Sequence, residues 1–407
     1  MISPSPRRHV PLFLTGAASL QTGLFVGTTL VLFLVVQRSS HLVSQTVEAR
    51  WAGGLLALLL ALPLGVLVDR VRRRSALVTS SLLSALALGA LTVALWQGWT
   101  VFPLTALVLA VLPLLRQTGE LAQDAFLPAL VGRDRLIPIN AILAMVGPVL
   151  WLGFMFAEAH LWLMAIGTVA FAVCALSFRA IDVAEEPAPP RTGWWREMTE
   201  GVRFTCAHPV LRAIALYLAA TELLEPLVDD LIRRPAAGPA AMFLLEATAP
   251  AGAVAALLLH RRVGGFRLAW AALLVTQPFA VLLLLSDTGW GAVWHTAGTF
   301  VWWAGATTAA IALLGHRQAI TPARLLGRTG ATLLVLTSVA GFAGSALRAL
   351  AEGLWRRDLE AHVAVWPVVT LAVAGLVAAV FLLYRVRALT TEPAEPSAPA
   401  PPATSGT

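Results

Sequence analysis

The sequence has no lysine and little charge of either sign. Its 407 residues are 58% hydrophobic and only 13% charged, with a mean hydropathy of +0.78. Soluble domains carry roughly 25% charged residues, so this chain lacks the polar side chains that would coat a water-soluble protein of its length. The composition argues against a soluble protein and predicts an all-α membrane protein.

Cysteine is scarce too, and sequence motifs for catalysis are missing. Cys174 and Cys206 lie far apart, and their spacing fits neither a metal site nor a redox motif. No phosphate-binding G-x-x-x-x-G-K-[ST] loop occurs, and no lysine could complete one. We find no catalytic triad and no paired glycosidase carboxylates. We therefore expect neither an enzyme nor an ATP-driven pump, and no metal or cofactor.

The formal net charge of +7 does not indicate a nucleic-acid partner. The arginines lie in short gaps between apolar runs rather than together on one polar domain. We expect no binding to nucleic acid.

Long apolar runs dominate what the sequence does contain. About 20 apolar residues suffice to cross a hydrocarbon core about 30 Å thick. The first run is too long for a signal peptide and lacks a convincing cleavage site, so we expect it to stay as a membrane helix. Twelve transmembrane helices are predicted, at 11–36, 48–68, 75–96, 101–125, 139–158, 161–180, 210–229, 238–259, 266–286, 289–313, 329–350 and 363–385.

These helices fall into two groups of six. Residues 1–180 are predicted to form an N-terminal six-helix bundle, and residues 210–387 a C-terminal one. Between them, 181–209 contains prolines and mixed charges, which predict a cytoplasmic linker with a short surface helix. The proline-, alanine- and serine-rich tail, 388–407, is expected to be disordered.

The arginines also predict an orientation. With the N-terminus in the cytoplasm, most of the 29 arginines fall in cytoplasmic segments, as the positive-inside rule requires. The bias persists through both halves, which favours an even number of spans. We expect a multi-pass protein of the cell membrane with both termini cytoplasmic.

The stretch GVLVDRVRRR, residues 65–74, ends the second apolar run. A cluster of arginines there could act only as an orientation signal. The stretch also resembles the loop between helices 2 and 3 of the major facilitator superfamily, G-x-x-x-D-R-x-G-R-R, with Arg72 in place of the second glycine. The residues that match this motif, and that the resemblance implies act as a conformational latch, are Gly65, Asp69, Arg70, Arg73 and Arg74.

Other stretches extend this resemblance over nearly the whole chain. Residues 126–141, 200–213 and 317–331 resemble loops of the drug and siderophore exporter branch of the superfamily. The repeat of the latch motif at 260–267 has His260 in place of the aspartate, so any latch there is expected to be weaker.

The resemblance implies the major facilitator fold, in which two six-helix bundles rock about a central cavity to give alternating access. It implies export of a small organic molecule, such as a drug, antibiotic or siderophore-like metabolite, driven by proton antiport. The expected partners are this substrate, protons and the lipid bilayer, and we expect a monomer. An importer or facilitator, a lipid flippase and a non-transporting accessory protein remain as alternatives.

Charged residues within spans are costly and usually face a cavity or a partner. Arg116 and Glu120 lie one turn apart on predicted helix 4 and are candidates for proton coupling, or form a pair that neutralises itself. Glu222 and Glu225 on helix 7, with Glu246 on helix 8, are further candidates for carrying the proton. Alternatively, these carboxylates lie at the interface, exposed to water.

A helix bend and an aromatic cavity are also predicted. Gly147 and Pro148 match the Gly-Pro of an antiporter motif in helix 5, although Gly-Pro also occurs in other kinked membrane helices. A cavity lined by aromatic side chains would bind flat or cationic compounds, whereas tryptophans also anchor membrane interfaces. The residues predicted to line the cavity are Gln21, Phe25, Trp151, Trp302 and Trp303.

Overall fold

The computed structural model describes residues 9–31, 43–99, 102–156, 161–183, 185, 193–232, 239–285, 289–355 and 365–390. Within these ranges every regular element is a helix. The helices of the N-terminal half are α1 (Val10–Phe25), η2 (Val26–Leu30), α3 (Val43–Leu59), α4 (Ala61–Arg70), α5 (Arg73–Trp96), α6 (Phe102–Val131), η4 (Arg133–Arg135), α7 (Leu136–Ala144), α8 (Val146–Phe156) and α9 (Leu161–Ala180). Those that follow are α10 (Trp194–Ala207), α11 (Pro209–Ile232), α12 (Pro239–Glu246), α13 (Thr248–Val263), α14 (Gly265–Thr276), η5 (Gln277–Leu285), α15 (Gly291–Ile320), η6 (Ala323–Leu325), α16 (Leu326–Trp355), α17 (Val365–Arg385) and η7 (Arg387–Thr390).

Most of these helices can cross a membrane. In the described part of the chain, ten are long and apolar enough, and the bent pair α3–α4 makes an eleventh if it counts as one span. α11 has a comparable length, but Arg212, Glu222 and Glu225 make it less apolar. The predicted all-helical membrane fold is confirmed, whereas the count of twelve spans stays a prediction.

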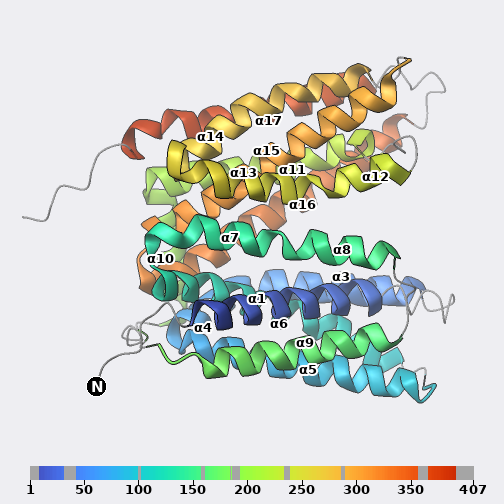
Figure 1. The fold of residues 1–407 in the computed structure, drawn as a ribbon, viewed down its shortest axis with the longest axis vertical. Helices are drawn as coiled ribbons and strands as arrows, with labels where there is room; N and C mark the ends of the chain where they lie inside the picture. Colours follow the sequence, from blue (N-terminus) through green and yellow to red (C-terminus); the bar gives the residue numbers. More distant parts are fainter. Residues whose placement is uncertain are drawn as a thin grey trace, which may run out of the picture.

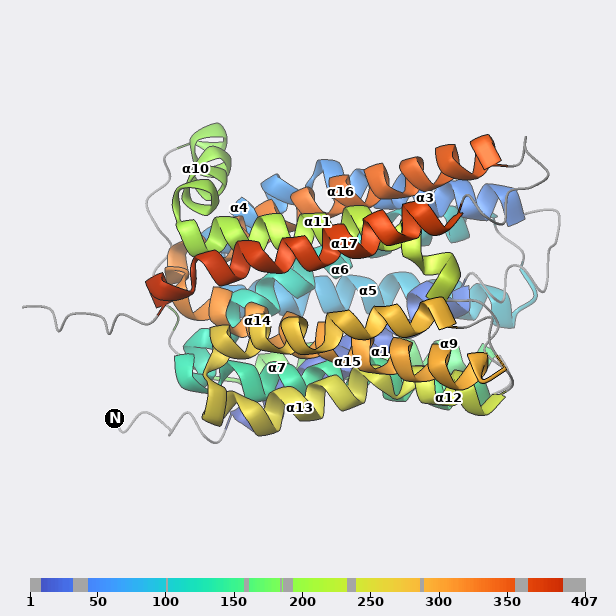
Figure 2. The ribbon, with the colours of Figure 1, turned by 90° about the horizontal axis from the view of Figure 1, so that it is seen from above.

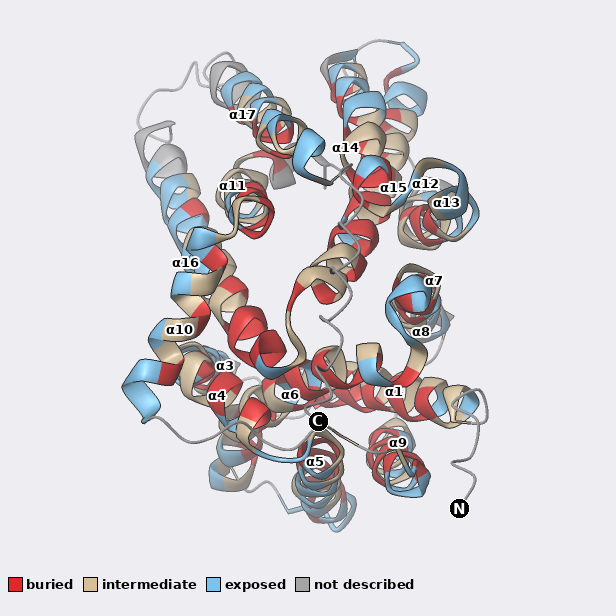
Figure 3. Cartoon of the chain, turned by 90° about the vertical axis from the view of Figure 1, so that its left-hand side faces the viewer, coloured by how far each residue is buried: buried red, intermediate tan, exposed pale blue. Residues whose placement is uncertain are grey.

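Apolar side chains cover the outer surface of the bundle. Leu86, Leu258 and Leu371 are each about two-thirds exposed, and the outward faces of the helices carry most of the exposed residues in the end-on view (Figure 3). Exposing so many large apolar side chains to water would be unfavourable. This surface suits a hydrocarbon solvent.

The long helices run roughly along one direction and divide into two groups (Figure 1). Helices α1 to α9 occupy the lower part of that view and α11 to α17 the upper part. Helix α10 lies across the end of the bundle at which α1 begins and α17 ends (Figure 2). We call this end the α10 end.

Separate apolar cores support the two groups of helices. The larger core consists mainly of residues from α1 to α9, and the rings of Phe13, Phe126 and Phe178 meet there at centroid distances of 5.8 to 6.4 Å. Two further cores contain only residues between Val210 and Leu383. Leu326 and Ala331 of α16 join the larger core, so one helix of the second group packs against the first.

The second span bends sharply. α3 and α4 meet at 56°, and the break lies at Leu60, three residues before Pro63. Proline has no N–H and its ring clashes with the carbonyl four residues earlier, so Pro63 accounts for the bend. α7 and α8 likewise break at Met145, three residues before the predicted bend residue Pro148.

The predicted helix positions are matched closely where apolar runs stop at polar residues, as in α9. Several helices extend beyond the prediction: α6 to Val131, α15 to Ile320, and α3 back to Val43. The predictions for α6 and α15 were too short because they stopped near the polar residues Asp124 and Arg317, which face each other rather than water.

Candidate functional site

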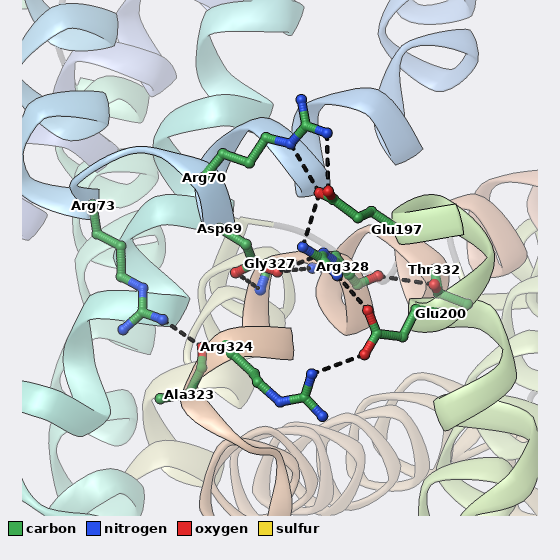
Figure 4. A network of polar contacts seen from close by, with 10 residues as sticks. All are labelled: Asp69, Arg70, Arg73, Glu197, Glu200, Ala323, Arg324, Gly327, Arg328 and Thr332. Atoms are coloured by element: carbon green, nitrogen blue, oxygen red, sulfur yellow. Dashed lines mark hydrogen bonds and ion pairs between the residues drawn. The ribbon is translucent and has the colours of Figure 1, made fainter. Parts of the chain in front are cut away.

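The two groups of helices are tied together at the α10 end by Asp69, the next-to-last residue of α4. Its carboxylate accepts the backbone N–H groups of Gly327 at 2.9 Å and Arg328 at 3.0 Å (Figure 4). These donors belong to the first turn of α16, where N–H groups have no partner within the helix and the helix dipole favours a negative charge. Asp69 therefore caps a helix of the other half of the chain.

Gly65, one turn before Asp69, allows α4 and α16 to approach this closely. A Cβ at Gly65 would lie 2.5 Å from the Cβ of Ala331 and 2.7 Å from the carbonyl oxygen of Gly327. Both distances are too short for real contacts, so a side chain at position 65 would force the two helices apart.

Arg328 links α16 to α10. Its guanidinium donates to Glu197 at 3.0 Å and to Glu200 at 2.6 Å, and its Nε lies 3.6 Å from the Asp69 carboxylate. The side chains of Arg328 and Glu197 are 4% and 1% exposed. Charges so deeply buried are stable only when they are paired, so α10 is an integral part of this contact.

Arg70 completes the link from the first half of the chain. It donates two hydrogen bonds to Glu197, at 2.8 and 3.0 Å, and lies over the ring of Trp194 at 4.2 Å. A two-point arginine–carboxylate pair fixes direction as well as distance. Glu197 is thus held between Arg70 of the first half and Arg328 of the second.

The remaining arginines of the predicted latch also make defined contacts. Arg73 donates to the carbonyl of Ala323, just before α16. The backbone N–H groups of Arg73 and Arg74 donate to Glu185 at 2.7 and 3.1 Å. The structure therefore brings every predicted latch residue to the α10 end, and we call Asp69, Arg70, Glu197, Glu200, Arg324 and Arg328 the α10-end network.

A second tie joins α6 and α7 to α15. Arg317 pairs with Asp124 at 2.6 Å, and Gln318 accepts a hydrogen bond from Asn140 at 2.8 Å. In contrast, a ring nitrogen of His260, which replaces the aspartate in the motif repeat, lies 2.8 Å from the carbonyl of Leu257 in its own helix. The two halves thus do not use equivalent residues to close this end.

Two cavities lie between the helices, away from the α10-end network. One, of about 620 Å³, is lined by α3, α6 and α16 and includes Arg116 and Glu120. The other, of about 440 Å³, is lined by α3, α11 and α16 and includes Glu222 and Glu225. Both are bounded by helices of both halves, as a central transport cavity would be.

The predicted proton-coupling residues therefore separate into groups. Arg116 donates to Glu120 at 2.9 Å, and both side chains are about half exposed, which matches the self-neutralising pair that the sequence left open. Glu246 ends α12 and does not line either cavity. Glu222 and Glu225 remain as cavity carboxylates of α11.

The predicted cavity residues take different positions. Phe25 and Trp151 form an edge-to-face pair with centroids 6.0 Å apart, and Gln21 is half-buried on α1. Trp302 is buried in an apolar core, with Trp303 packed against that core. None of these five lines the two cavities described above.

Sequence reasoning missed four members of the network and several residues that line the cavities, among them Arg50. Glu200, Arg324 and Arg328 lie in stretches that resembled the exporter branch, but nothing in the sequence paired them. Glu197 lies in the linker that was expected only to carry a surface helix. Arg50 falls near the start of the predicted helix 48–68, where it was not singled out, whereas α3 starts at Val43 and Arg50 lines the larger cavity.

Comparisons with known proteins agree with the fold. No model of a known protein family matches the chain. The chain is 27% identical over 355 residues to the uncharacterized MFS-type transporter y4rN of Sinorhizobium fredii, covering 81% of this chain and 85% of that protein.

Solved structures share the architecture at low sequence identity. A bacterial homologue of the iron transporter ferroportin, in an outward-facing state, superposes with a TM-score of 0.69 at 15% identity, covering 92% of this chain and 98% of the other. The major facilitator superfamily transporter FucP in its outward conformation gives 0.67 at 12% identity, covering 94% and 99%. The human organic anion transporter MFSD10 gives 0.68 at 16% identity, covering 94% and 100%.

The chain therefore resembles transporters of the major facilitator superfamily type, in fold at low identity and in sequence at 27% identity. The relatives and structural neighbours named above are transporters, which are not enzymes. Placement in the drug and siderophore exporter branch stays a prediction.

Proposed function

We propose that the protein exports a small organic molecule across the cell membrane by proton antiport, opening one central cavity alternately to the two sides. The observation that carries the proposal is the hold of Asp69 on the first turn of α16. This contact joins the two halves at the α10 end. A contact of this kind can close one side of a cavity and must break for that side to open.

The α10 end is assigned to the cytoplasm in this proposal. Arg70, Arg73 and Arg74 gather there with the arginines of α10 and the start of α16. Such a concentration of arginine next to spans is retained on the cytoplasmic side. The structure would then represent the state closed to the cytoplasm.

Carboxylates in the cavity walls support coupling to protons. Glu222 and Glu225 lie on α11, facing a cavity that helices of both halves bound. An intramembrane carboxylate in a cavity is a natural proton carrier because its surroundings change when the cavity changes sides. We assign the role of proton carrier to Glu222, which lies beside Glu225.

Proton-loaded liposomes containing the purified protein test the proposal. A panel of antibiotics and siderophores is added at two pH gradients, and proton movement is followed with an entrapped pH dye. We expect at least one compound to drive proton release, and Glu222→Gln to abolish it. Glu246→Gln removes a carboxylate that lies outside both cavities and should retain the activity.

Other outcomes distinguish the alternatives. Compound movement that ignores the pH gradient would indicate a facilitator instead of an antiporter. No movement of any compound, with intact folding, would contradict the transport proposal.

A further inference from the structure

The two cavities meet at a shared wall. Trp51 of α3 and Ser338 and Phe342 of α16 line both of them. The rings of Trp51 and Phe342 lie 6.0 Å apart at 44°, and their side chains are 61% and 42% exposed. An apolar aromatic surface therefore stands between two charged compartments of about 620 and 440 Å³.

The larger compartment carries one excess positive charge. Arg116 and Glu120 neutralise each other at 2.9 Å. Arg50, on the third turn of α3, also lines this compartment, and it forms no ion pair or side-chain hydrogen bond with any residue that the structure describes. A lone guanidinium partway along a membrane helix is costly unless it faces a cavity that supplies water or an anion.

The smaller compartment carries the opposite charge. Glu222 lines it, and its carboxylate makes no ion pair or hydrogen bond within the described residues. Its Oε2 would lie 3.5 Å from a Cβ at Gly341, so the carboxylate lies directly against α16. Glu225 and Arg348, which also line this compartment, both take part in other interactions. Glu222 is therefore the acid with spare bonding capacity here.

We propose that the joined cavities bind a dipolar organic molecule, with an anionic group on Arg50, a protonated amine on Glu222 and an apolar or aromatic body against Trp51 and Phe342. This inference rests on the proposed function, because it names the substrate class of the same cavity. The combined space is sufficient for a molecule of drug size. The exposed rings of Trp51 and Phe342 offer surfaces that bind both flat aromatic bodies and the alkylammonium end of a ligand.

The arrangement discriminates against molecules with only one charge. A ligand without its anionic group would leave Arg50 facing an apolar group. A ligand without its amine would leave Glu222 facing an apolar group. Removing one partner of a charged hydrogen bond costs affinity by about tenfold or more. Selectivity for both charges at once is the signature of this site.

A matched set of four compounds tests the inference by titration calorimetry on the full-length protein in nanodiscs. The probe is 4′-(aminomethyl)biphenyl-4-carboxylic acid, which carries an amine and a carboxylate at opposite ends of an apolar body. Its methyl ester keeps only the amine, its N-acetyl derivative keeps only the carboxylate, and the doubly capped compound has no charge. We expect the dipolar probe to bind tightest, with each capping weakening binding about tenfold or more.

Two variants assign the ends of the ligand. Arg50→Gln should remove the preference for the free acid over the ester and leave the preference for the free amine. Glu222→Gln should do the reverse. Glu48→Gln, an exposed acid on the same helix as Arg50 that lines neither cavity, is the control and should change neither preference.

Binding is measured without any pH gradient or transport. The binding test can therefore fail while the proposed function holds, and the reverse. Equal binding of all four compounds, no binding of any of them, or variants that weaken every compound alike would each overturn the inference. Selective binding without proton movement in liposomes would keep this inference and contradict antiport.

Discussion

The carboxylate of Asp69 bonds to two backbone N–H groups that α16 cannot satisfy by itself, because the first turn of a helix has no carbonyl partners for its donors. At the residue scale, this contact can therefore form only while the α10 end is closed. When the α10 end opens, Asp69 loses both donors and Gly327 and Arg328 expose theirs. Water can replace these partners, so the contact can break and reform, as the proposed transport cycle requires.

Replacing Asp69 with asparagine tests this residue directly. Asp69→Asn removes the charge and one of the two acceptors, which should weaken the closed state by about 1–2 kcal/mol. Hydrogen–deuterium exchange should then become faster in peptides covering Gly327 and Arg328. Asp134→Asn, at an exposed acid of η4, serves as the control; similar exchange in both variants would show that Asp69 does not protect the α16 turn.

Arg328 and Arg324 offer a second comparison, since both donate to Glu200 but differ in burial. Arg328 is 4% exposed and Arg324 is 59% exposed. Arg328→Gln leaves Glu197 buried with one partner fewer and should cost about 3 kcal/mol, whereas Arg324→Gln should cost less than about 1 kcal/mol. Thermal unfolding in detergent measures both, and equal effects would mean that the buried arginine contributes no more than the surface one.

At the scale of elements, α10 acts as a bridge between the halves. Its buried residues Glu197, Gly201 and Thr205 recur at four-residue spacing and form one face. A Cβ at Gly201 would lie 2.7 Å from that of Arg328, so this face packs tightly on α16. Trp195, on α10, is 80% exposed.

The contact between α4 and α16 predicts an effect of side-chain size. Gly65→Val should keep the α10 end from closing, because a Cβ there would meet Ala331 and Gly327. Single-molecule energy transfer between dyes at Ser75 and Arg267, exposed residues of the two halves, should show a larger separation. Gly54→Val is the matched control, since nothing lies within 4 Å of a Cβ at Gly54; an unchanged separation in Gly65→Val would show that this close approach does not control closure.

The positions of the helices could be predicted from the sequence far better than the contacts between distant residues. The apolar runs indicated the spans because a helix that crosses lipid needs a continuous local stretch of apolar residues. α9 matched to the residue, and the motif at 65–74 indicated a latch. The partners of Arg70 could not be predicted, because Glu197 lies 127 residues away and only the packing of α10 brings it near. The ends of α6 and α15 were misplaced for a related reason: a polar residue such as Asp124 or Arg317 marks the end of a span only where it faces water, not where it faces a protein partner.

At the scale of the whole molecule, charged contacts hold the two halves together at the α10 end in the part of the chain that the structure describes. Ion pairs join the halves at the α10 end, through Asp69–Arg328, Arg70–Glu197–Arg328 and Asp124–Arg317. The charged cavities lie farther along the helices, between α3, α6, α11 and α16. Each bundle has a core of its own, and a small apolar cluster of α7, α13 and α15 residues lies between them, so the two can rock as bodies about such a cavity.

The measurement that tests alternating access most directly is a pair of spin-label distances in the full-length protein, in a Cys206→Ser background. One pair, at Ser75 and Arg267, reports the α10 end, and the other, at Gln97 and Trp290, reports the opposite end. We expect Asp69→Asn to lengthen the first distance and shorten the second, because opening one side closes the other. Distances that stay unchanged, or that lengthen together at both ends, would contradict the account.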